Sequence, residues 1–389
     1  MEEVSYMKVS ESVLALKEEV TKHRRWFHRH PELGFDVQNT RDYILAQLSQ
    51  WDFDEVRVLA GTGIKAVMRG KDPDLTLAFR ADMDALSLQE ETGLDFASCI
   101  AGRMHACGHD GHMAVLLGFG EWLHRHKGSL KNNVVLIFQP AEESEGGALP
   151  MIKEGVLQDP KVDAVFGFHI YPDVPQGKIG LSPGPIMAQT CEFDVELLGK
   201  SAHGAMPHRG VDALLAAAYF INTLQGIITR KIDPFEKALI TIGKIRGGER
   251  RNILAERVRM EGMIRTFSDD VYQSIKENIL GLLQGMELSH GIRGSFKEVV
   301  YYPVVDNNPE WTEKLARLLP KEAIHPMAPL MISEDFSYFQ KEVPGVYFFL
   351  GCGNREKGHT FPLHSNRFNF DEEVLLLGIQ MYVNILQSC

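Results

Sequence analysis

The run Val134-Val-Leu-Ile-Phe138 is uninterrupted and apolar, and Gln139-Pro-Ala-Glu142-Glu143 follows it directly. Near-continuous apolar runs of strand length are typical of strands in a parallel sheet that helices cover on both faces. Largely apolar runs of similar length recur between helical patterns, at Ile64–Met68, Leu75–Phe79, Val165–Phe168 and Val346–Leu350. The alternation predicts an α/β fold with a mixed, mostly parallel sheet, whose active site lies beyond the carboxyl ends of the strands.

The pattern changes near Gln189. From there to residue 305 the apolar periodicity predicts the order βαββαβ, which is the ferredoxin-like α+β unit. The expected elements are Cys191–Leu198, Asp212–Thr229, Ala238–Ile245, Val258–Phe267, Asp269–His290 and Ser295–Val305. We therefore expect one α/β domain, formed by residues 1–188 and 306–389, that is interrupted by a smaller inserted domain at residues 189–305.

Helices are expected at both ends of the larger domain. An amphipathic pattern from Val13 to His30 is ended by Pro31, and a shorter one covers Thr40 to Leu48. Further helical patterns lie at 112–126, 149–154, 309–319 and 371–386.

Composition excludes several classes of protein. The chain has 389 residues, with 52 acidic and 41 basic side chains and a net charge of −11, which argues against a nucleic-acid-binding surface. Its five cysteines are scattered and form no C-x-x-C pair, as expected in a reducing compartment. No apolar stretch has the length of a signal peptide core or of the roughly 20 residues that span a bilayer. We therefore expect a cytoplasmic protein.

The segment His105-Ala-Cys107-Gly-His109-Asp110-Gly-His112 concentrates three imidazoles, a thiol and a carboxylate just before a predicted helix. Cys107 and His109 are two positions apart, so in an extended segment they point to the same side and could bind one metal ion or flank two. A polar loop satisfied by local hydrogen bonds is the alternative. A structural zinc site is disfavoured because no second pair lies at the finger spacing.

Glu142 and Glu143 follow a predicted strand directly. Adjacent carboxylates project differently, so one can bind a metal ion while the other accepts a proton from metal-activated water. Paired glutamates are also common on solvated surfaces, and Glu145 nearby favours that alternative. Their position at the carboxyl end of a strand favours the catalytic interpretation.

Three further segments carry polar side chains after apolar runs. His169 follows Val165–Phe168, His364 lies near the end of the chain, and each alone could be a ligand or a core histidine. Asp82 and Asp84 follow another strand and could fix the tautomers of ligating imidazoles, and Asp110 could do the same. An α/β fold would bring all of these segments together.

These motifs resemble those of the dinuclear-metal aminoacylase/carboxypeptidase family, in the branch of hippurate hydrolases, N-acetyldiaminopimelate deacetylases and auxin-conjugate amidohydrolases. The similarity begins at Arg25-Trp-Phe-His-Arg-His-Pro-Glu32 and continues through Ser333-Glu-Asp-Phe-Ser337 to Leu363-His-Ser-Asn366. It implies a catalytic metal-binding domain and an inserted lid or dimerisation domain. The ligands it implies for two divalent metal ions are Cys107, His109, Glu143, His169 and His364.

The resemblance also implies roles for four other residues. Glu142 would be the general base, and His203 would polarise the scissile carbonyl from its own chain or from the partner subunit of a homodimer or a dimer-based tetramer. Asn252 and Arg265 would hold the free carboxylate of the substrate, which suits the bidentate fork of arginine. Without the resemblance, a solvated charge at a strand end is the simpler interpretation of Arg265.

The expected activity is hydrolysis of an N-acyl amino acid to a carboxylic acid and a free amino acid. The thiol of Cys107 favours zinc and the surrounding carboxylates suit manganese, with cobalt or nickel possible. A dipeptidase or carboxypeptidase with the same two-metal site is the first alternative. A non-catalytic homologue that only binds a metal or ligand is the second.

Overall fold

The computed structural model describes residues 7–389, which form two compact units. Unit 1 contains the described residues up to Gly184 together with Asp306–Ala328 and Asp335–Cys389. Unit 2 contains Pro185–Val305 and the short segment Pro329–Glu334. The roles of these two units, catalytic and lid or dimerisation, stay predictions.

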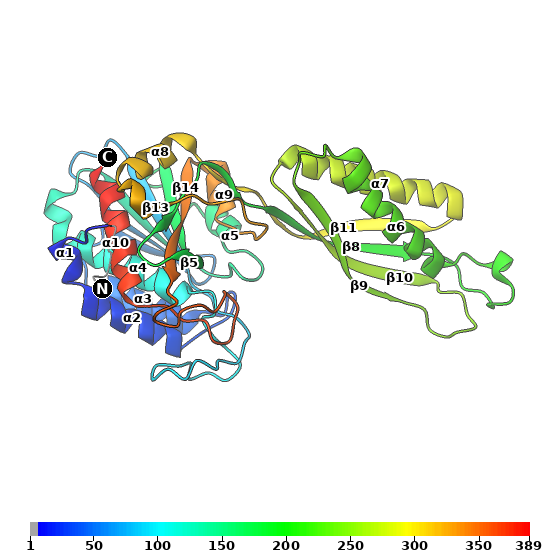
Figure 1. The fold of residues 1–389 in the computed structure, drawn as a ribbon, viewed down its shortest axis with the longest axis horizontal. Helices are drawn as coiled ribbons and strands as arrows, with labels where there is room; N and C mark the ends of the chain where they lie inside the picture. The colour runs from blue at the N-terminus through cyan, green and yellow to red at the C-terminus, as the bar shows by residue number, and fades with distance from the viewer. Residues whose placement is uncertain (1–6) are drawn as a thin grey trace. The chain divides into compact units, whose positions relative to one another are not determined.

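Unit 1 is built on a mixed sheet, of which Figure 1 labels β5, β13 and β14. The strand order of the sheet is β1-β2-β4-β3-β5-β14-β6-β13. The pairs β4–β3, β3–β5, β5–β14 and β6–β13 are parallel, whereas β1–β2, β2–β4 and β14–β6 are antiparallel. Strands β2, β3 and β4 are buried along their whole length, which explains their nearly continuous apolar sequences. The strands are β1 (Glu55–Leu59), β2 (Gly63–Met68), β3 (Thr76–Asp82), β4 (Asn133–Gln139), β5 (Ala164–Pro175), β6 (Ile179–Gly180), β13 (Ile324–His325) and β14 (Gly345–Gly353).

Helices cover both faces of this sheet. Successive side chains of a strand point to opposite faces, and in β14 Tyr347 contacts Phe336 next to α9 whereas Phe348 contacts Tyr382 of α10. Helices α4 and α10 lie side by side on the Phe348 face (Figure 1). The helices are α1 (Glu11–Leu14), α2 (Lys17–Arg29), α3 (Gln38–Leu48), α4 (His109–His126), α5 (Ala148–Lys153), α8 (Pro309–Arg317), α9 (Ser337–Glu342) and α10 (Glu373–Gln387).

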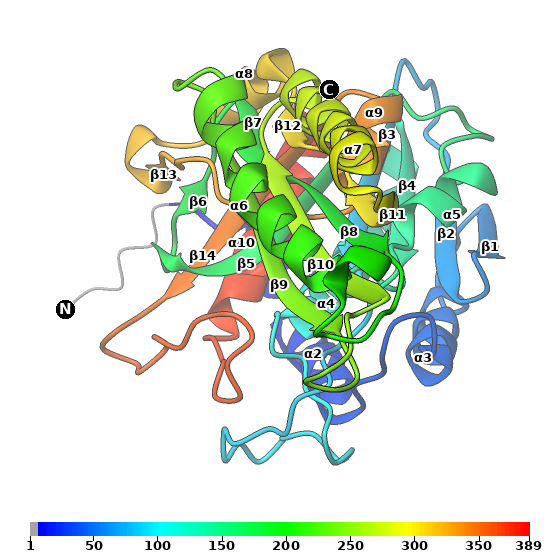
Figure 2. The same cartoon turned by 90° about the vertical axis from the view of Figure 1, so that its right-hand side faces the viewer.

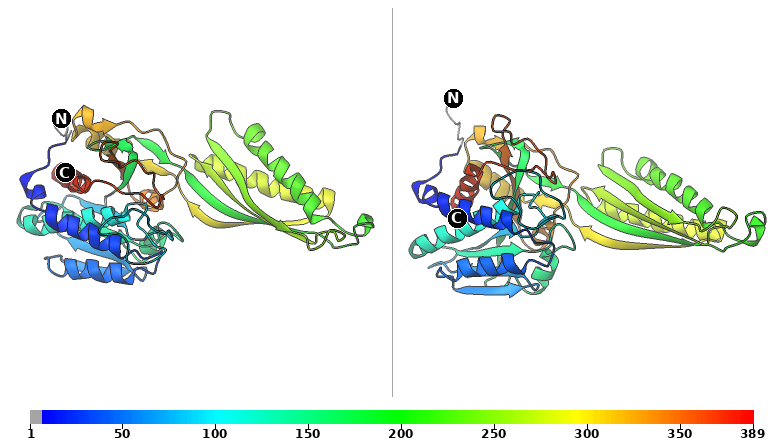
Figure 3. Two further views of the ribbon diagram at one scale, coloured as in Figure 1. Left: turned by 60° about the horizontal axis from the view of Figure 1, so that its bottom comes forward. Right: turned by 90° about the horizontal axis from the view of Figure 1, so that it is seen from below.

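Unit 2 is an antiparallel sheet with the order β11-β8-β10-β9 and two helices packed on one face (Figures 2 and 3). Asp212 and Ser268 cap the helices by accepting hydrogen bonds from main-chain N–H groups of the first turn. The chain order matches the predicted βαββαβ unit. The elements are β8 (Gln189–Leu198), α6 (Ala213–Lys231), β9 (Ala238–Gly247), β10 (Arg257–Thr266), α7 (Asp269–His290) and β11 (Arg293–Tyr302).

Two expected elements differ from the structure. The helix expected from Val13 to His30 is split into α1 and α2 by a turn at Ala15 and Leu16, where the Leu16 side chain is buried in the core. The strand expected to end at Val305 stops at Tyr302, because Pro303 has no N–H group to continue the ladder. Strand β12 (Val305–Asn307) then pairs with β7 (Gly184–Met187) in a separate two-stranded sheet.

Across residues 7–389, no helix combines the length and the apolar character that crossing a membrane would require.

Candidate metal centre

The candidate ligands come from segments that the parallel strands bring to one edge of the unit 1 sheet. Glu142 and Glu143 follow β4, His169 lies within β5, and Cys107 and His109 lie at the start of α4. Gly108 precedes α4 with a φ of 85°, a left-handed conformation that glycine adopts without strain. The topology therefore places thiol, imidazole and carboxylate groups together.

Two non-glycine residues at this edge have the same uncommon backbone conformation. Ala141, just before Glu142, has a φ of 59°, and His364 has a φ of 64°. Main-chain hydrogen bonds hold both: Gly146 N donates to Ala141 O at 2.9 Å, and His364 N donates to Ala106 O at 2.8 Å. Such strained residues cluster at functional sites, where the surrounding structure maintains them.

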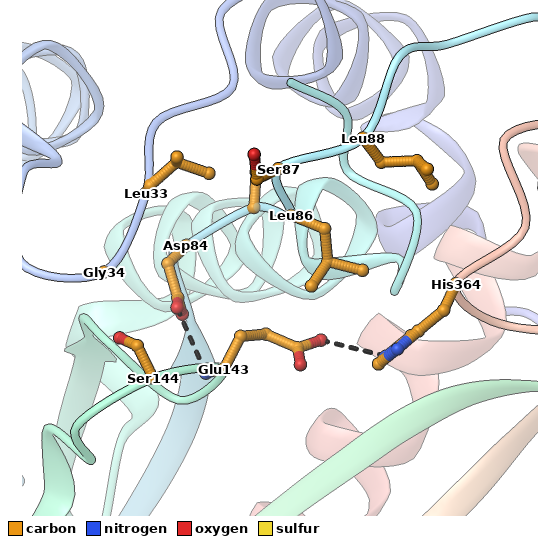
Figure 4. Close-up of a pocket in the computed structure, with 10 residues that line it drawn as sticks. Leu33, Gly34, Asp84, Leu86, Ser87, Leu88, Glu143, Ser144 and His364 are labelled. Carbon is orange, nitrogen blue, oxygen red and sulfur yellow. Dashed lines mark hydrogen bonds and ion pairs between the residues drawn. The ribbon is translucent and has the colours of Figure 1, made fainter. Parts of the chain in front are cut away.

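Five side chains predicted as metal ligands lie together in two overlapping groups. The potential ligand atoms of Cys107, His109 and His169 lie within 4.8 Å of one another, as do those of Cys107, Glu143 and His364. Cys107 Sγ is 3.3 Å from His169 Nε2, and His364 Nε2 is 3.2 Å from Glu143 Oε1 (Figure 4). The shared Cys107 makes this a candidate site for two neighbouring cations. Metal binding by these residues stays a prediction.

The protonation states of this cluster follow from burial and charge. Burial, together with the carboxylates of Glu143 and Glu142, holds the pKa of the Cys107 thiol well above its usual value. Burial also lowers the pKa of His169 to about 3, which keeps its imidazole neutral. Burial alone would raise the pKa of Glu143, but the hydrogen bond from His364 and the charge of His109 outweigh it and lower that pKa to about 2. Neutral imidazole and ionised carboxylate are the forms that bind cations.

Main-chain carbonyl groups orient two of the imidazoles. His109 donates from Nδ1 to the main-chain oxygen of Asp84 at 2.8 Å, and His169 donates from Nδ1 to that of Ile170 at 2.7 Å. Each Nε2 is therefore left to face the cluster. His112, for which the sequence suggested no role, has Nδ1 2.6 Å from Asp82 Oδ1 and accepts from Ile170 N at 3.0 Å through Nε2. It holds β5 beside α4.

The three aspartates predicted to support the ligands lie in different settings. Asp82 contacts His112, as above. Asp84 accepts hydrogen bonds from the main-chain N–H groups of Glu142 at 2.9 Å and Glu143 at 3.1 Å, so it holds the segment that carries both glutamates. Asp110 instead contacts Arg24 at 3.2 Å and His28 at 2.9 Å. Asp110 therefore supports the start of α4 through α2.

A second buried network supports the same segment and was not predicted. Asp335 accepts hydrogen bonds from Arg80 at 2.9 Å, from Gln139 at 2.8 Å and from the main-chain N–H of Ala148 at 3.0 Å. These contacts bracket the turn that carries Glu142 on both sides. The Ser333–Ser337 motif was the signal for this network, but its role requires the pairing of segments far apart in the chain.

The remaining candidate residues lie in unit 2. His203 is exposed, and its neighbour Gly204 donates to the main-chain oxygen of Asn252 at 2.8 Å, so the two loops are adjacent. Arg265 lies in β10, and among the described residues its buried Nε and Nη1 have no hydrogen-bond partner. A partly buried guanidinium with unused donors suits an anionic ligand. The roles of these three residues stay predictions.

Comparisons with known proteins identify relatives along nearly the whole chain. The model of peptidase family M20/M25/M40 matches residues 78–388. N-acetyldiaminopimelate deacetylase of Bacillus subtilis is 39% identical over 371 residues, which is 94% of this chain and 96% of that protein. Thermostable carboxypeptidase 1 of Saccharolobus solfataricus is 38% identical over 379 residues, which is 95% of each chain.

Solved structures are similar as well. A putative aminohydrolase from methicillin-resistant Staphylococcus aureus has a TM-score of 0.92 and 37% identity, with 97% of each chain covered. A Bacillus subtilis protein described as a dinuclear metal binding peptidase from the M20 family has a TM-score of 0.83 and 31% identity, with 96% of this chain and 98% of that one covered. The predicted fold class and family are confirmed. The chain therefore belongs to peptidase family M20/M25/M40, and it is an amide-bond hydrolase of that family.

Proposed function

We propose that this protein hydrolyses the amide bond of N-acyl amino acids, using two divalent metal ions held by Cys107, His109, Glu143, His169 and His364. The observation that carries the proposal is the pair of overlapping ligand groups that share Cys107. The names of relatives, a deacetylase of an N-acetyl amino acid and a carboxypeptidase, support this class of substrate.

Glu142 is the general base in this proposal. When bound, the metal ions would supply Lewis-acid polarisation of the scissile carbonyl and would lower the pKa of water. A carboxylate oxygen of Glu142 lies within 4.8 Å of ligand atoms of His109 and Glu143, and the hydrogen bond to Asp84 fixes its main chain. The Glu142 carboxylate accepts the proton of the attacking water and returns it to the leaving amine.

Three further residues, Arg265, Asn252 and His203, have proposed roles in substrate binding. Arg265, with its unused buried donors, would bind the carboxylate of the amino acid together with Asn252. His203 would stabilise the negative charge that develops on the carbonyl oxygen. The donor set contains sulfur, nitrogen and oxygen, so it fits zinc or manganese, and cobalt or nickel are further candidates.

A homodimer is the proposed assembly. Strand β9 is an edge of the unit 2 sheet, and Ile245 on it is 47% exposed. Leu215 and Tyr219 of the neighbouring helix α6 are also exposed. Edge strands with exposed apolar side chains are open to pairing with a second chain. Light scattering coupled to size exclusion should give twice the chain mass, and Ile245→Lys should shift it toward the monomer.

Carboxypeptidase activity with the same site is the second candidate, and the name of the Saccharolobus relative favours it. Assays of acetyl-, benzoyl- and indoleacetyl-amino acids, run in parallel with dipeptides, distinguish the two activities. Release of amine from the N-acyl compounds, with slower cleavage of dipeptides, is the result that we expect.

The variant Glu142→Ala tests the mechanism. Turnover should fall by about 10² to 10⁴, the contribution of a positioned general base, while bound metal stays near the wild-type value. Glu145→Ala is the matched control, because Glu145 lies in the same turn and is exposed. Wild-type turnover in Glu142→Ala would contradict the assignment of the base.

A further inference from the structure

An open pocket of about 450 Å³ lies beside the Glu143–His364 pair, and all of its lining residues belong to unit 1 (Figure 4). Its apolar walls are formed by Leu33, Leu86 and Leu88. We propose that this pocket receives the acyl group of the substrate and selects apolar acyl groups longer than acetyl. The inference rests on the proposed function and specifies its substrate class.

The charges around the pocket indicate which half of the substrate enters it. Its ionisable lining residues are Asp84, Glu143 and His364, and none of the lining residues is lysine or arginine. These residues offer the carboxylate of the amino-acid half no ammonium or guanidinium partner, whereas the leucine side chains favour an uncharged group. The acyl half carries no charge. It can therefore occupy the pocket while its carbonyl remains next to Glu143 and His364.

Main-chain hydrogen bonds hold the pocket walls in place. Ala85 N donates to Glu32 O at 2.7 Å, which ties the segment that carries Leu86 to the segment that carries Leu33. Leu86 and Met104 exchange two main-chain hydrogen bonds of 3.0 Å each. The side chain of Leu86 projects toward the Glu143–His364 pair (Figure 4). A preformed apolar wall discriminates between acyl groups by the apolar area that each of them buries against it. Because the wall is already ordered, binding costs little free energy of reorganisation.

The size of the pocket argues against acetyl as the preferred group. Small-molecule sites have volumes of roughly 300–1,000 Å³, and this one is within that range, far larger than a single methyl group. Each further methylene that is buried is worth roughly a fourfold gain in binding. A hexanoyl group adds four methylenes. Because the pocket is open on one side, we expect at least about a tenfold higher kcat/KM for hexanoyl than for acetyl compounds.

The test compares paired N-hexanoyl and N-acetyl derivatives of glycine, leucine and diaminopimelate on the metal-loaded full chain. Amine release gives the ratio of kcat/KM within each pair. Calorimetric titration of the same pairs into Glu142→Ala gives the ratio of Kd without turnover. Leu86→Asn and Leu33→Asn replace apolar wall with an amide of similar size, and each should lower both ratios at least about threefold.

Leu14→Asn is the matched control, because Leu14 is exposed on α1 and does not line the pocket. It should leave both ratios unchanged. If Leu86→Asn fails to fold, as circular dichroism would show, Leu33→Asn decides the outcome. A hexanoyl-to-acetyl ratio near one, or a ratio that neither wall variant lowers, overturns the inference and leaves the proposed function standing. Absence of amine release from every derivative overturns the proposed function and this inference with it.

Discussion

Replacing His28 with glutamine tests the buried network that holds α2 against the start of α4. The His28 side chain is 1% exposed, and its ring nitrogens lie 2.9 Å from Asp110 Oδ2 and 3.1 Å from Glu90 Oε1. Burial alone would lower the pKa of His28, but the hydrogen bonds to Asp110 and Glu90 outweigh it and raise the pKa from 6.5 to about 9. The imidazolium is therefore the form that stabilises the fold.

The direction of the pH dependence follows from this raised pKa. The stabilisation is fully present below pH 6.5, declines as the pH rises and is lost once the pH passes about 9. Each pKa unit corresponds to about 1.4 kcal/mol, so the shift contributes about 3 kcal/mol to the free energy of unfolding. We expect the difference in stability between wild type and His28→Gln to be larger by that amount at pH 6 than at pH 9.5.

Urea unfolding followed by tryptophan fluorescence measures this difference. All four tryptophans, Trp26, Trp51, Trp122 and Trp311, belong to unit 1, so their emission reports on the unit that contains His28. His126→Gln is the control. His126 donates from Nδ1 to the main-chain oxygen of Trp122 at 2.7 Å, whereas His28 contacts two carboxylates. A difference between wild type and His28→Gln that stays constant from pH 6 to pH 9.5 would refute the reasoning.

Two further variants test how the turn that carries Glu142 and Glu143 is held. Asp84→Asn weakens the acceptors of the Glu142 and Glu143 N–H groups. We expect metal affinity to fall by about 10- to 100-fold, as for other groups that orient ligands. Calorimetric metal titration measures this affinity. Gly147→Ala places a Cβ 1.9 Å from Pro140 O. We therefore expect the free energy of unfolding, measured by thermal unfolding, to fall by about 1–3 kcal/mol. In Gly226→Ala the added Cβ meets open space on α6, so the free energy of unfolding should instead rise by up to about 1 kcal/mol. Equal stabilities of the two alanine variants would contradict the steric argument.

Much of the fold could be predicted because buried strands have a simple sequence pattern. The apolar runs at β2, β3, β4 and β5 follow directly from burial on both faces. Strand β1 was missed because it is a largely exposed edge strand, so its residues Glu55–Leu59 form no apolar run. Short elements such as α9 carry too few residues to show a periodicity.

The convergence of the candidate ligands could also be predicted, because parallel strands place their carboxyl ends at one edge. Their detailed support could not. His109 and His169 are oriented by main-chain oxygens rather than by the predicted carboxylates. Asp110 faces Arg24 and His28, although it is adjacent to His109. Which group lies opposite a side chain depends on the pairing of distant segments, and local periodicity carries no information about that.

The metal content of the purified protein tests the central claim most directly. Cys107 belongs to both ligand groups, so a change at this one position should affect both metal ions. After equilibration with Mn²⁺ or Zn²⁺ and removal of unbound ions, elemental analysis should find two metal ions per chain in the wild type and fewer than one in Cys107→Ala. Two metal ions per chain in Cys107→Ala, or none in the wild type, would contradict the account.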